Sequence, residues 1–277
     1  MKPIFIDTHC HLNFKRFDKT REQVIKESQE NGIEIYIVPG TDITSSQKAV
    51  EIAAQNTAVY AAVGFHPHHT FSVNRVTGNV QNDMHELEKL IVHPKVVAVG
   101  EVGLDKHVYE ETKYNDYQIS DAFIDVQKEY FVAQIRLAKK YQKALIIHNR
   151  ETKKELLEVL DKEWSHNLSF HTVFHCCEPD NELLEYAKKH NMYIGVDGDV
   201  TYGGEKAEFV KTIPLEMLVL ETDSPFLLPD PLRAQKLYPN TPANIPLIAE
   251  CIAKIKGVLQ EKVAEVTTQN AQRLFGL

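Results

Sequence analysis

The length, composition and charge of the chain exclude several classes of protein. It has 277 residues, of which 43% are hydrophobic and 25% charged, with a formal net charge of −8. A chain of this charge does not coat nucleic acid irrespective of sequence, although bound divalent cations can create a local positive field. No apolar run approaches the ~18 residues of a membrane span, and we expect neither a signal peptide nor a membrane partner. The four cysteines lack CxxC spacing, which predicts a reducing, cytoplasmic location.

Short apolar runs rich in β-branched residues predict eight strands. They cover residues 4–7, 33–38, 59–64, 96–102, 145–148, 170–175, 192–197 and 218–223. These runs are almost continuously apolar, as expected for strands that are covered on both faces.

Segments with helical periodicity lie between and after these runs. They cover residues 20–30, 43–56, 121–141, 153–161, 182–190, 205–212, 242–256 and 261–274. Asp42, Asp121 and Asp180 stand where helix N-caps are expected. Two longer loops, 70–82 and 105–120, follow the third and fourth predicted strands.

The alternation of strands and helices predicts an α/β fold with right-handed βαβ units and a parallel sheet. Eight units indicate one domain over residues 1–277, a TIM-type (β/α)8 barrel with its active site at the C-terminal ends of the strands. An open doubly wound sheet is the alternative. No glycine-rich fingerprint follows the first strand, so we expect no organic cofactor.

Side chains that can bind metal recur where the predicted strands end. The first strand runs into Asp7-Thr8-His9-Cys10-His11, and alternate residues of an extended segment point the same way, so His9 and His11 can reach one ion. Later strand ends carry Glu101, Asp105, His148, Arg150, His175 and Asp223. In a barrel these ends meet at one rim. Four histidines with two carboxylates suit Zn²⁺, Mn²⁺ or Mg²⁺, and a carboxylate such as Glu101 can bridge two ions.

Each of these residues also has a purely structural interpretation. The histidines can be hydrogen-bonded core residues, Glu101 can belong to a buried ion pair, and Asp223 can cap a turn. The recurrence at five of eight strand ends favours a metal site, because burying so many titratable groups is costly unless they are paired or metal-bound. His66 is a candidate substrate contact, whereas His171 is expected to point into the core one layer below His175.

The motifs D-x-H-x-H, G-E-x-G-L-D, H-x-R, H-C and E-T-D-S-P, in this order, resemble the TatD family of metal-dependent deoxyribonucleases in the amidohydrolase superfamily. The match runs from Phe5 to the last predicted helix, and residues 63–68 resemble the family's G-x-H-P. The resemblance implies six metal ligands, namely His9, His11, Glu101, His148, His175 and Asp223. It also implies that Glu101 bridges two ions, that Asp223 acts as general base, and that His66 and Arg150 contact a phosphate. Asp105 is expected to orient ligands.

The chain departs from the family pattern at the predicted barrel mouth. His175-Cys176-Cys177-Glu178-Pro179 stands where the family has H-C-F-S-G, residues 109–117 form an expanded loop, and the family's asparagine–proline stretch appears at residues 238–242. Loops at the mouth decide substrate preference, so these changes leave the metal site intact but bear on the substrate.

Together, these features predict a monomeric 3′-5′ exodeoxyribonuclease that uses two divalent ions on single-stranded DNA. Phe65 and Tyr202 are candidate stacking surfaces for a terminal base, although either can equally be core packing, and Arg150, Arg233 and Lys236 are candidate positive groups at the mouth. One alternative is a hydrolase of an amide, ester or D-aminoacyl-tRNA link on the same scaffold. Another is a non-catalytic metal-binding barrel.

Overall fold

Eight parallel strands form the centre of the molecule, in a computed structural model that describes residues 3–71 and 80–277. Each strand pairs with the next in chain order, from β1 to β8. The strands are β1 (Phe5–Asp7), β2 (Ile33–Pro39), β3 (Val59–Val63), β4 (Val96–Asp105), β5 (Ala144–Arg150), β6 (Thr172–Phe174), β7 (Tyr193–Val196) and β8 (Leu218–Leu220).

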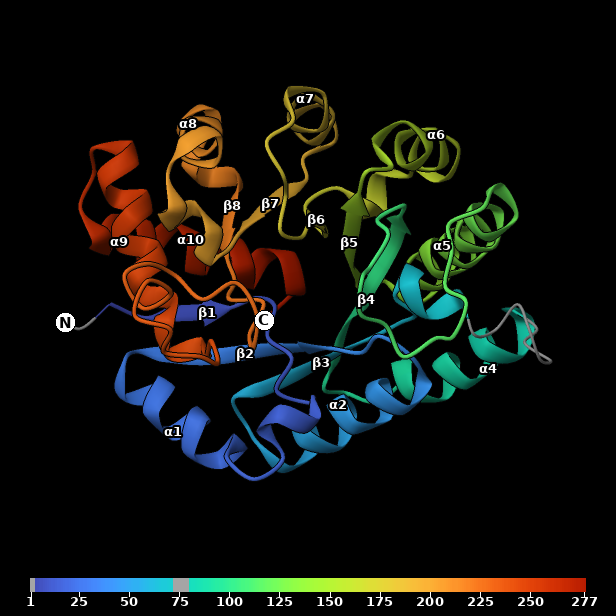
Figure 1. Cartoon of the computed structure of the whole chain (residues 1–277), viewed down its shortest axis with the longest axis horizontal. Coiled ribbons are helices and arrows are strands. Elements are labelled where there is room, and N and C mark those ends of the chain that lie inside the picture. The colour runs from blue at the N-terminus through green and yellow to red at the C-terminus, as the bar shows by residue number, and fades with distance from the viewer. Residues whose placement is uncertain (1–2, 72–79) are drawn as a thin grey trace.

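Helices surround the strands on the outside (Figure 1). They are α1 (Arg21–Glu30), α2 (Ile43–Gln55), α4 (Val80–Ile91), α5 (Asp121–Tyr141), α6 (Lys153–Glu163), α7 (Asn181–His190), α8 (Gly204–Thr212), α9 (Ile245–Lys256) and α10 (Gln260–Phe275). Two short 3-10 helices, η2 (Pro67–His69) and η4 (Gly198–Tyr202), follow β3 and β7. In the part of the chain that the structure describes, no helix is long and apolar enough to cross a membrane.

Contacts just beyond the strand ends join β1 to β8. The Thr8 amide donates to the Leu220 carbonyl at 3.0 Å, and Cys10 forms a parallel bridge with Ser224. The sheet therefore curves round on itself, and the predicted (β/α)8 barrel is confirmed.

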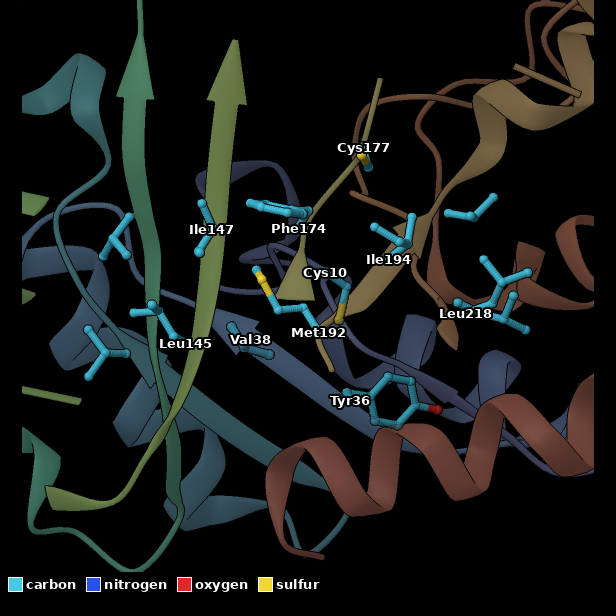
Figure 2. Packing of buried hydrophobic residues seen from close by; sticks show 14 of the residues in the cluster. Cys10, Tyr36, Val38, Leu145, Ile147, Phe174, Cys177, Met192, Ile194 and Leu218 are labelled. Atoms are coloured by element: carbon cyan, nitrogen blue, oxygen red, sulfur yellow. The ribbon is translucent and has the colours of Figure 1, made fainter. Parts of the chain in front are cut away.

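The alternation of side chains along the strands produces two apolar layers. One layer packs between the strands and the helices, and Figure 2 shows part of it around Ile147, Phe174 and Ile194. The opposite strand faces fill the barrel interior with one residue from each strand, namely Ile6, Ile37, Ala62, Ala98, Ile146, Val173, Tyr193 and Val219. Leu274 and Phe275 of α10 join the interior layer and close the N-terminal end of the barrel. The C-terminal end is left for the polar side chains.

The local predictions for helix starts and loops are confirmed in part. Asp42 and Asp180 cap α2 and α7, but Ser120 rather than Asp121 caps α5, accepting from the Phe123 amide. The loop after β4 contains no helix or strand from residue 106 to residue 120. The loop predicted for residues 70–82 is wrong at its end, because α4 begins at Val80, and its residues 72–79 lie outside the described residues.

The prediction that His171 points into the core is wrong. β6 begins only at Thr172, so His171 precedes the strand and its side chain is exposed. Its Nδ1 atom lies 3.0 Å from the Leu274 carbonyl oxygen of α10. This histidine therefore belongs to the closed N-terminal end of the barrel, on the far side from the other candidate residues.

Candidate metal centre

The C-terminal end of the barrel carries a cavity of about 540 Å³. Strands β4 and β5 extend furthest toward it, and their register places Gly103 beside His148 and Asp105 beside Arg150. A Cβ at Gly103 would meet the His148 carbonyl oxygen at 1.9 Å, so only glycine allows this approach. The predicted residues that line the cavity are His11, His66, Glu101, His148, Arg150, His175 and Asp223, and His9 is buried beside them.

Four of the six predicted ligands converge in one group. His9 Nε2 and His11 Nε2 lie 3.2 Å apart, and Glu101 Oε2 is 3.4 Å from the first and 3.8 Å from the second. Asp223 Oδ1 is 3.3 Å from His11 Nε2 and 3.8 Å from His9 Nε2. Ligands about 2.1 Å from a tetrahedral ion stand about 3.4 Å from one another. The ligand atoms of His9, His11 and Glu101 therefore form a group that could hold one divalent ion, and Asp223 Oδ1 lies beside the two imidazoles of this group.

The other oxygen of Glu101 faces a second group of imidazoles. Glu101 Oε1 lies 2.8 Å from His148 Nδ1, 3.5 Å from His66 Nε2 and 3.6 Å from His175 Nε2. The two oxygens of one carboxylate thus serve two different sets of nitrogens. A carboxylate placed in this way can bridge two ions.

The polar atoms of this cluster fit metal ions better than they fit one another. Asp223 Oδ1 is buried and has no hydrogen-bond partner among the described residues. His9 and His175 stack face to face with ring centroids 3.5 Å apart, while both direct Nε2 toward Glu101. Neutral imidazole and carboxylate are ligands for Zn²⁺ and Mn²⁺, and the ions would balance the buried carboxylates.

Burial and neighbouring charges shift the pKa values of the titratable groups in this cluster. Burial alone would raise the pKa of Glu101, but the imidazoles of His66, His175 and His9 outweigh it and hold that pKa well below its usual value. Burial lowers the pKa of His9 and of His66, so both rings are neutral at pH 7. Glu101 is therefore an anion, as a bridging ligand must be.

Two imidazoles have carboxylate partners that raise their pKa. Burial lowers the pKa of His148, but hydrogen bonds with Asp105 and Glu101 raise it to about 9. Burial has the same effect on His175, and Glu221 and Glu101 overcome it to raise the pKa to about 10. Without metal both rings hold a proton at neutral pH, and a metal ion must displace it.

Carboxylates behind the cluster fix its geometry. Asp105 Oδ2 is 3.0 Å from His148 Nε2, in the orienting position predicted for it. Glu221 Oε1 is 3.0 Å from His175 Nδ1, and Asp7 accepts from the His9 amide and the Thr222 hydroxyl. The sequence analysis quoted Asp7 and Glu221 within motifs but gave them no role, although a carboxylate is the usual partner of a metal-binding histidine.

His66 differs from the other imidazoles in its second nitrogen. Its Nδ1 accepts a hydrogen bond from the His68 amide at 3.1 Å. Its ring proton must therefore lie on Nε2, which faces the cavity. A neutral ring with Nε2–H can donate to an anionic group but cannot bind a metal ion through that atom.

The aromatic and basic residues at the mouth are only partly those predicted. Phe65 is buried against Tyr130 and does not line the cavity, and Tyr202 lies outside it with the Arg233 guanidinium 3.6 Å from its ring centroid. Phe65 is therefore core packing, the alternative that the sequence left open, and none of Tyr202, Arg233 and Lys236 lines the cavity. Of the three predicted cations only Arg150 lines the cavity.

The aromatic residues that do line the cavity were missed. They are Phe14, Tyr109 and Phe226. Phe226 is 51% exposed and its ring centroid is 6.1 Å from that of Phe14, which in turn stacks on His11 at 4.2 Å. The position of Phe226, three residues after Asp223, was the available signal.

A (β/α)8 barrel with histidines and carboxylates gathered at its C-terminal rim defines the class of metal-dependent hydrolases. The chain belongs to the TatD family, because the sequence model described as "TatD related DNase" matches residues 6–276. This membership was predicted from the motifs and is confirmed.

Individual relatives extend over almost the whole chain. The chain is 34% identical over 274 residues to the uncharacterized metal-dependent hydrolase YabD of Bacillus subtilis, covering 98% of this chain and 99% of that protein. It is 30% identical over 275 residues to the 3′-5′ ssDNA/RNA exonuclease TatD of Escherichia coli, covering 98% of each. The crystal structure of YjjV, a TatD homologue from Escherichia coli, superposes with a TM-score of 0.83 at 26% identity and full coverage of both chains.

Proposed function

We propose that the protein is a two-metal phosphodiesterase that removes nucleotides from the 3′ end of single-stranded DNA. The observation that carries the proposal is the position of Glu101, whose two oxygens face two separate sets of imidazoles 2.8–3.8 Å away. The proposed ligands are His9, His11, Glu101, His148, His175 and Asp223. The similarity of the chain, at 30% identity, to the 3′-5′ ssDNA/RNA exonuclease TatD of Escherichia coli supports the substrate class.

The ions supply two effects when bound, a lowered pKa for water and neutralisation of charge on the phosphate. The chain supplies the rest. Asp223 holds Oδ1 at the cavity and accepts a proton from the attacking water. Its pKa is lowered because His11 and His175 outweigh the effect of burial, so it is ionised and ready to accept.

Two side chains are suited to hold the phosphate. The Arg150 guanidinium can bind two phosphate oxygens in parallel, and its position beside Tyr109 orients it over the cavity. His66 donates from Nε2. One cation and one neutral hydrogen-bond donor match the single negative charge of one terminal phosphodiester. The cavity volume of about 540 Å³ suits one nucleotide rather than a duplex.

We propose that the protein acts as a monomer, because every proposed ligand of the metal centre comes from one chain. We also propose a cytoplasmic location, which the four free cysteines support because a reducing compartment keeps thiols free.

Hydrolysis of a 5′-labelled single-stranded DNA oligomer tests the function. With Mg²⁺ or Mn²⁺ we expect a ladder that shortens from the 3′ end, which disappears with chelator and in Asp223→Asn. Asp230→Asn is the matched control, because Asp230 pairs with Arg233 outside the cavity. Hydrolysis of RNA of the same sequence, measured in parallel, shows whether the protein prefers deoxyribose or ribose in its substrate.

Two other outcomes would contradict the proposal. If the protein hydrolyses an ester, an amide or a D-aminoacyl-tRNA link but does not cleave DNA, the metal site acts on a carbonyl substrate. Bound ions with no turnover of any of these substrates would identify a non-catalytic metal-binding barrel.

A further inference from the structure

A second cluster of potential ligands lies in the wall of the same cavity. Cys176 follows β6, and Asp197 and Asp199 lie at the start of η4, after β7. The Cys176 sulfur and one carboxylate oxygen from each aspartate lie within 4.8 Å of one another. Cys176 and Asp199 line the cavity, whereas Asp197 is 0% exposed behind them.

Each of the two carboxylates has one oxygen with a partner and one without. Asp197 Oδ1 accepts from the Asp199 amide at 2.9 Å, and Asp199 Oδ2 lies 3.1 Å from Lys206 Nζ. Asp197 Oδ2 and Asp199 Oδ1 are buried and have no hydrogen-bond partner within residues 3–71 and 80–277. Buried carboxylate oxygens are normally paired with a donor or with a cation.

Lys206 balances only part of this negative charge. It is 7% exposed, and its ammonium group also donates to the Cys177 carbonyl at 2.8 Å, which holds it to one side of the cluster. With both aspartates ionised, two carboxylates and one ammonium group carry one net negative charge. If Cys176 binds as a thiolate, a single divalent ion brings the whole buried group to zero net charge.

We propose that Cys176, Asp197 and Asp199 bind a further divalent cation, separate from the histidine-rich centre. One thiolate and two carboxylates form a ligand set for Zn²⁺, with a fourth position left open toward the cavity. Lys206 opposes the ion by charge, but it contacts the other oxygen of Asp199 and thereby directs Oδ1 away from itself.

The ion has a consequence for the substrate, and this part rests on the proposed function. Asp199 and Glu178 both line the cavity in which the phosphate would bind. A cation held by Asp199 neutralises the negative charge of this cluster and offers its open position to a phosphate oxygen.

Titration of the metal-free protein with Co²⁺ tests the site without an activity assay. A Co²⁺–thiolate bond gives an intense charge-transfer band in the near ultraviolet, and the nitrogen and oxygen ligands of the histidine-rich centre give none. We expect this band in the wild-type protein, together with one more equivalent of bound Co²⁺ than in Cys176→Ser. Cys177→Ser is the matched control and should keep the band, because the neighbouring sulfur is not in the cluster.

Asp199→Asn provides a second variant at a position that is partly open to the cavity. It should weaken binding of the extra Co²⁺ at least tenfold without changing the near-ultraviolet circular dichroism of the metal-free protein. A wild-type protein without the charge-transfer band, or equal Co²⁺ contents in wild type and Cys176→Ser, would overturn the site. If the band is present while DNA is not cleaved, the cation site stands and only the proposed function fails.

Discussion

Glu221 Oε1 lies 3.0 Å from His175 Nδ1, while the opposite nitrogen of the same ring faces Glu101 Oε1 at 3.6 Å. Glu221 is 1% exposed, so this carboxylate is held behind the ring and out of reach of substrate. The negative charge of Glu221 behind Nδ1 helps to raise the pKa of this ring to about 10, so both of its nitrogens carry a proton in the metal-free protein and a metal ion has to displace the proton on Nε2.

Replacing Glu221 by Gln should weaken metal binding at the histidine-rich centre. The amide keeps the size of the side chain but removes its charge, and loss of such an orienting partner costs about 10- to 100-fold in metal affinity. Competition with a chelator of known affinity measures the change. Glu216→Gln, at an exposed position, should bind metal like the wild-type protein; equal affinities for both variants would remove Glu221 from the site.

Gly195→Ala should reproduce this loss through a neighbouring strand. A Cβ at Gly195 would stand 2.5 Å from each carboxylate oxygen of Glu221. The carboxylate is the movable end of its side chain, so we expect it to shift away from His175 while β7 remains paired. A metal affinity lowered about 10-fold or more, with unchanged far-ultraviolet circular dichroism, is the expected result. Unaltered affinity would mean that the contact with Glu221 is not needed to orient the ring.

Glu101→Gln should reduce metal content from about two equivalents to about one, because a neutral amide does not bridge two ions. Hydrolysis of DNA should fall at least about 100-fold, by loss of the charge stabilisation that the second ion provides. Elemental analysis and initial rates on the same sample measure both effects. Wild-type turnover in this variant would exclude a bridging role.

Phe226→Ala should weaken binding of single-stranded DNA with little effect on metal content. Stacking of a base on an aromatic side chain contributes about 1–3 kcal/mol, so KM should rise about 5- to 150-fold. Leu237→Ala is the control, because Leu237 is 55% exposed but does not line the cavity. A KM unchanged by Phe226→Ala would place the terminal base elsewhere.

Metal affinity should increase with pH up to about pH 9–10 and decrease in acid. Despite burial, hydrogen bonds with Asp105 and Glu101 raise the pKa of His148 to about 9, and the negative charges of Glu221 and Glu101 raise that of His175 to about 10. Below these values the metal-free rings carry the additional proton that makes them cations. For each proton that the ion has to displace, the apparent metal affinity falls about tenfold for every unit by which the pH is lowered. Calorimetric titrations with Zn²⁺ in buffers of different ionisation enthalpy count the protons released. Binding without proton release at neutral pH would contradict these pKa directions.

The order of the strands was predictable because a segment with helical periodicity separates most of the apolar runs from the next one. Between the third and fourth runs no helix was predicted, and α4 lies there. The ligand-bearing ends were predictable for β4 and β5, which continue as strands through Glu101 and His148, although the pairing of β4 with β5 shifts register between Val99 and Val102. The predicted sixth and eighth strands were too long, because β6 ends at Phe174 and β8 at Leu220, before His175 and Asp223. Asp223 has φ of +48°, a left-handed turn that strand periodicity does not reveal.

Contacts between distant segments account for what the sequence analysis missed. The pairing of Glu221 with His175 depends on how the chain after β6 meets the chain after β8. Phe65 immediately follows Gly64, and only the position of Tyr130 on α5 decides that this ring turns away from the cavity. Phe226 reaches the mouth because residues after Asp223 fold back beside Phe14. None of these relations has a local signal in the chain.

The closure between β1 and β8 ties the metal centre to the assembly of the barrel. Thr8 and Leu220 are 212 positions apart, yet their contact brings His9 and His11 beside Asp223. During synthesis, the nascent chain carries the first two of these ligands from the outset and cannot complete the set until nearly the whole barrel has emerged. An ion that requires all of them therefore binds only after the first strand has met the last, and its binding acts as a check on completed folding.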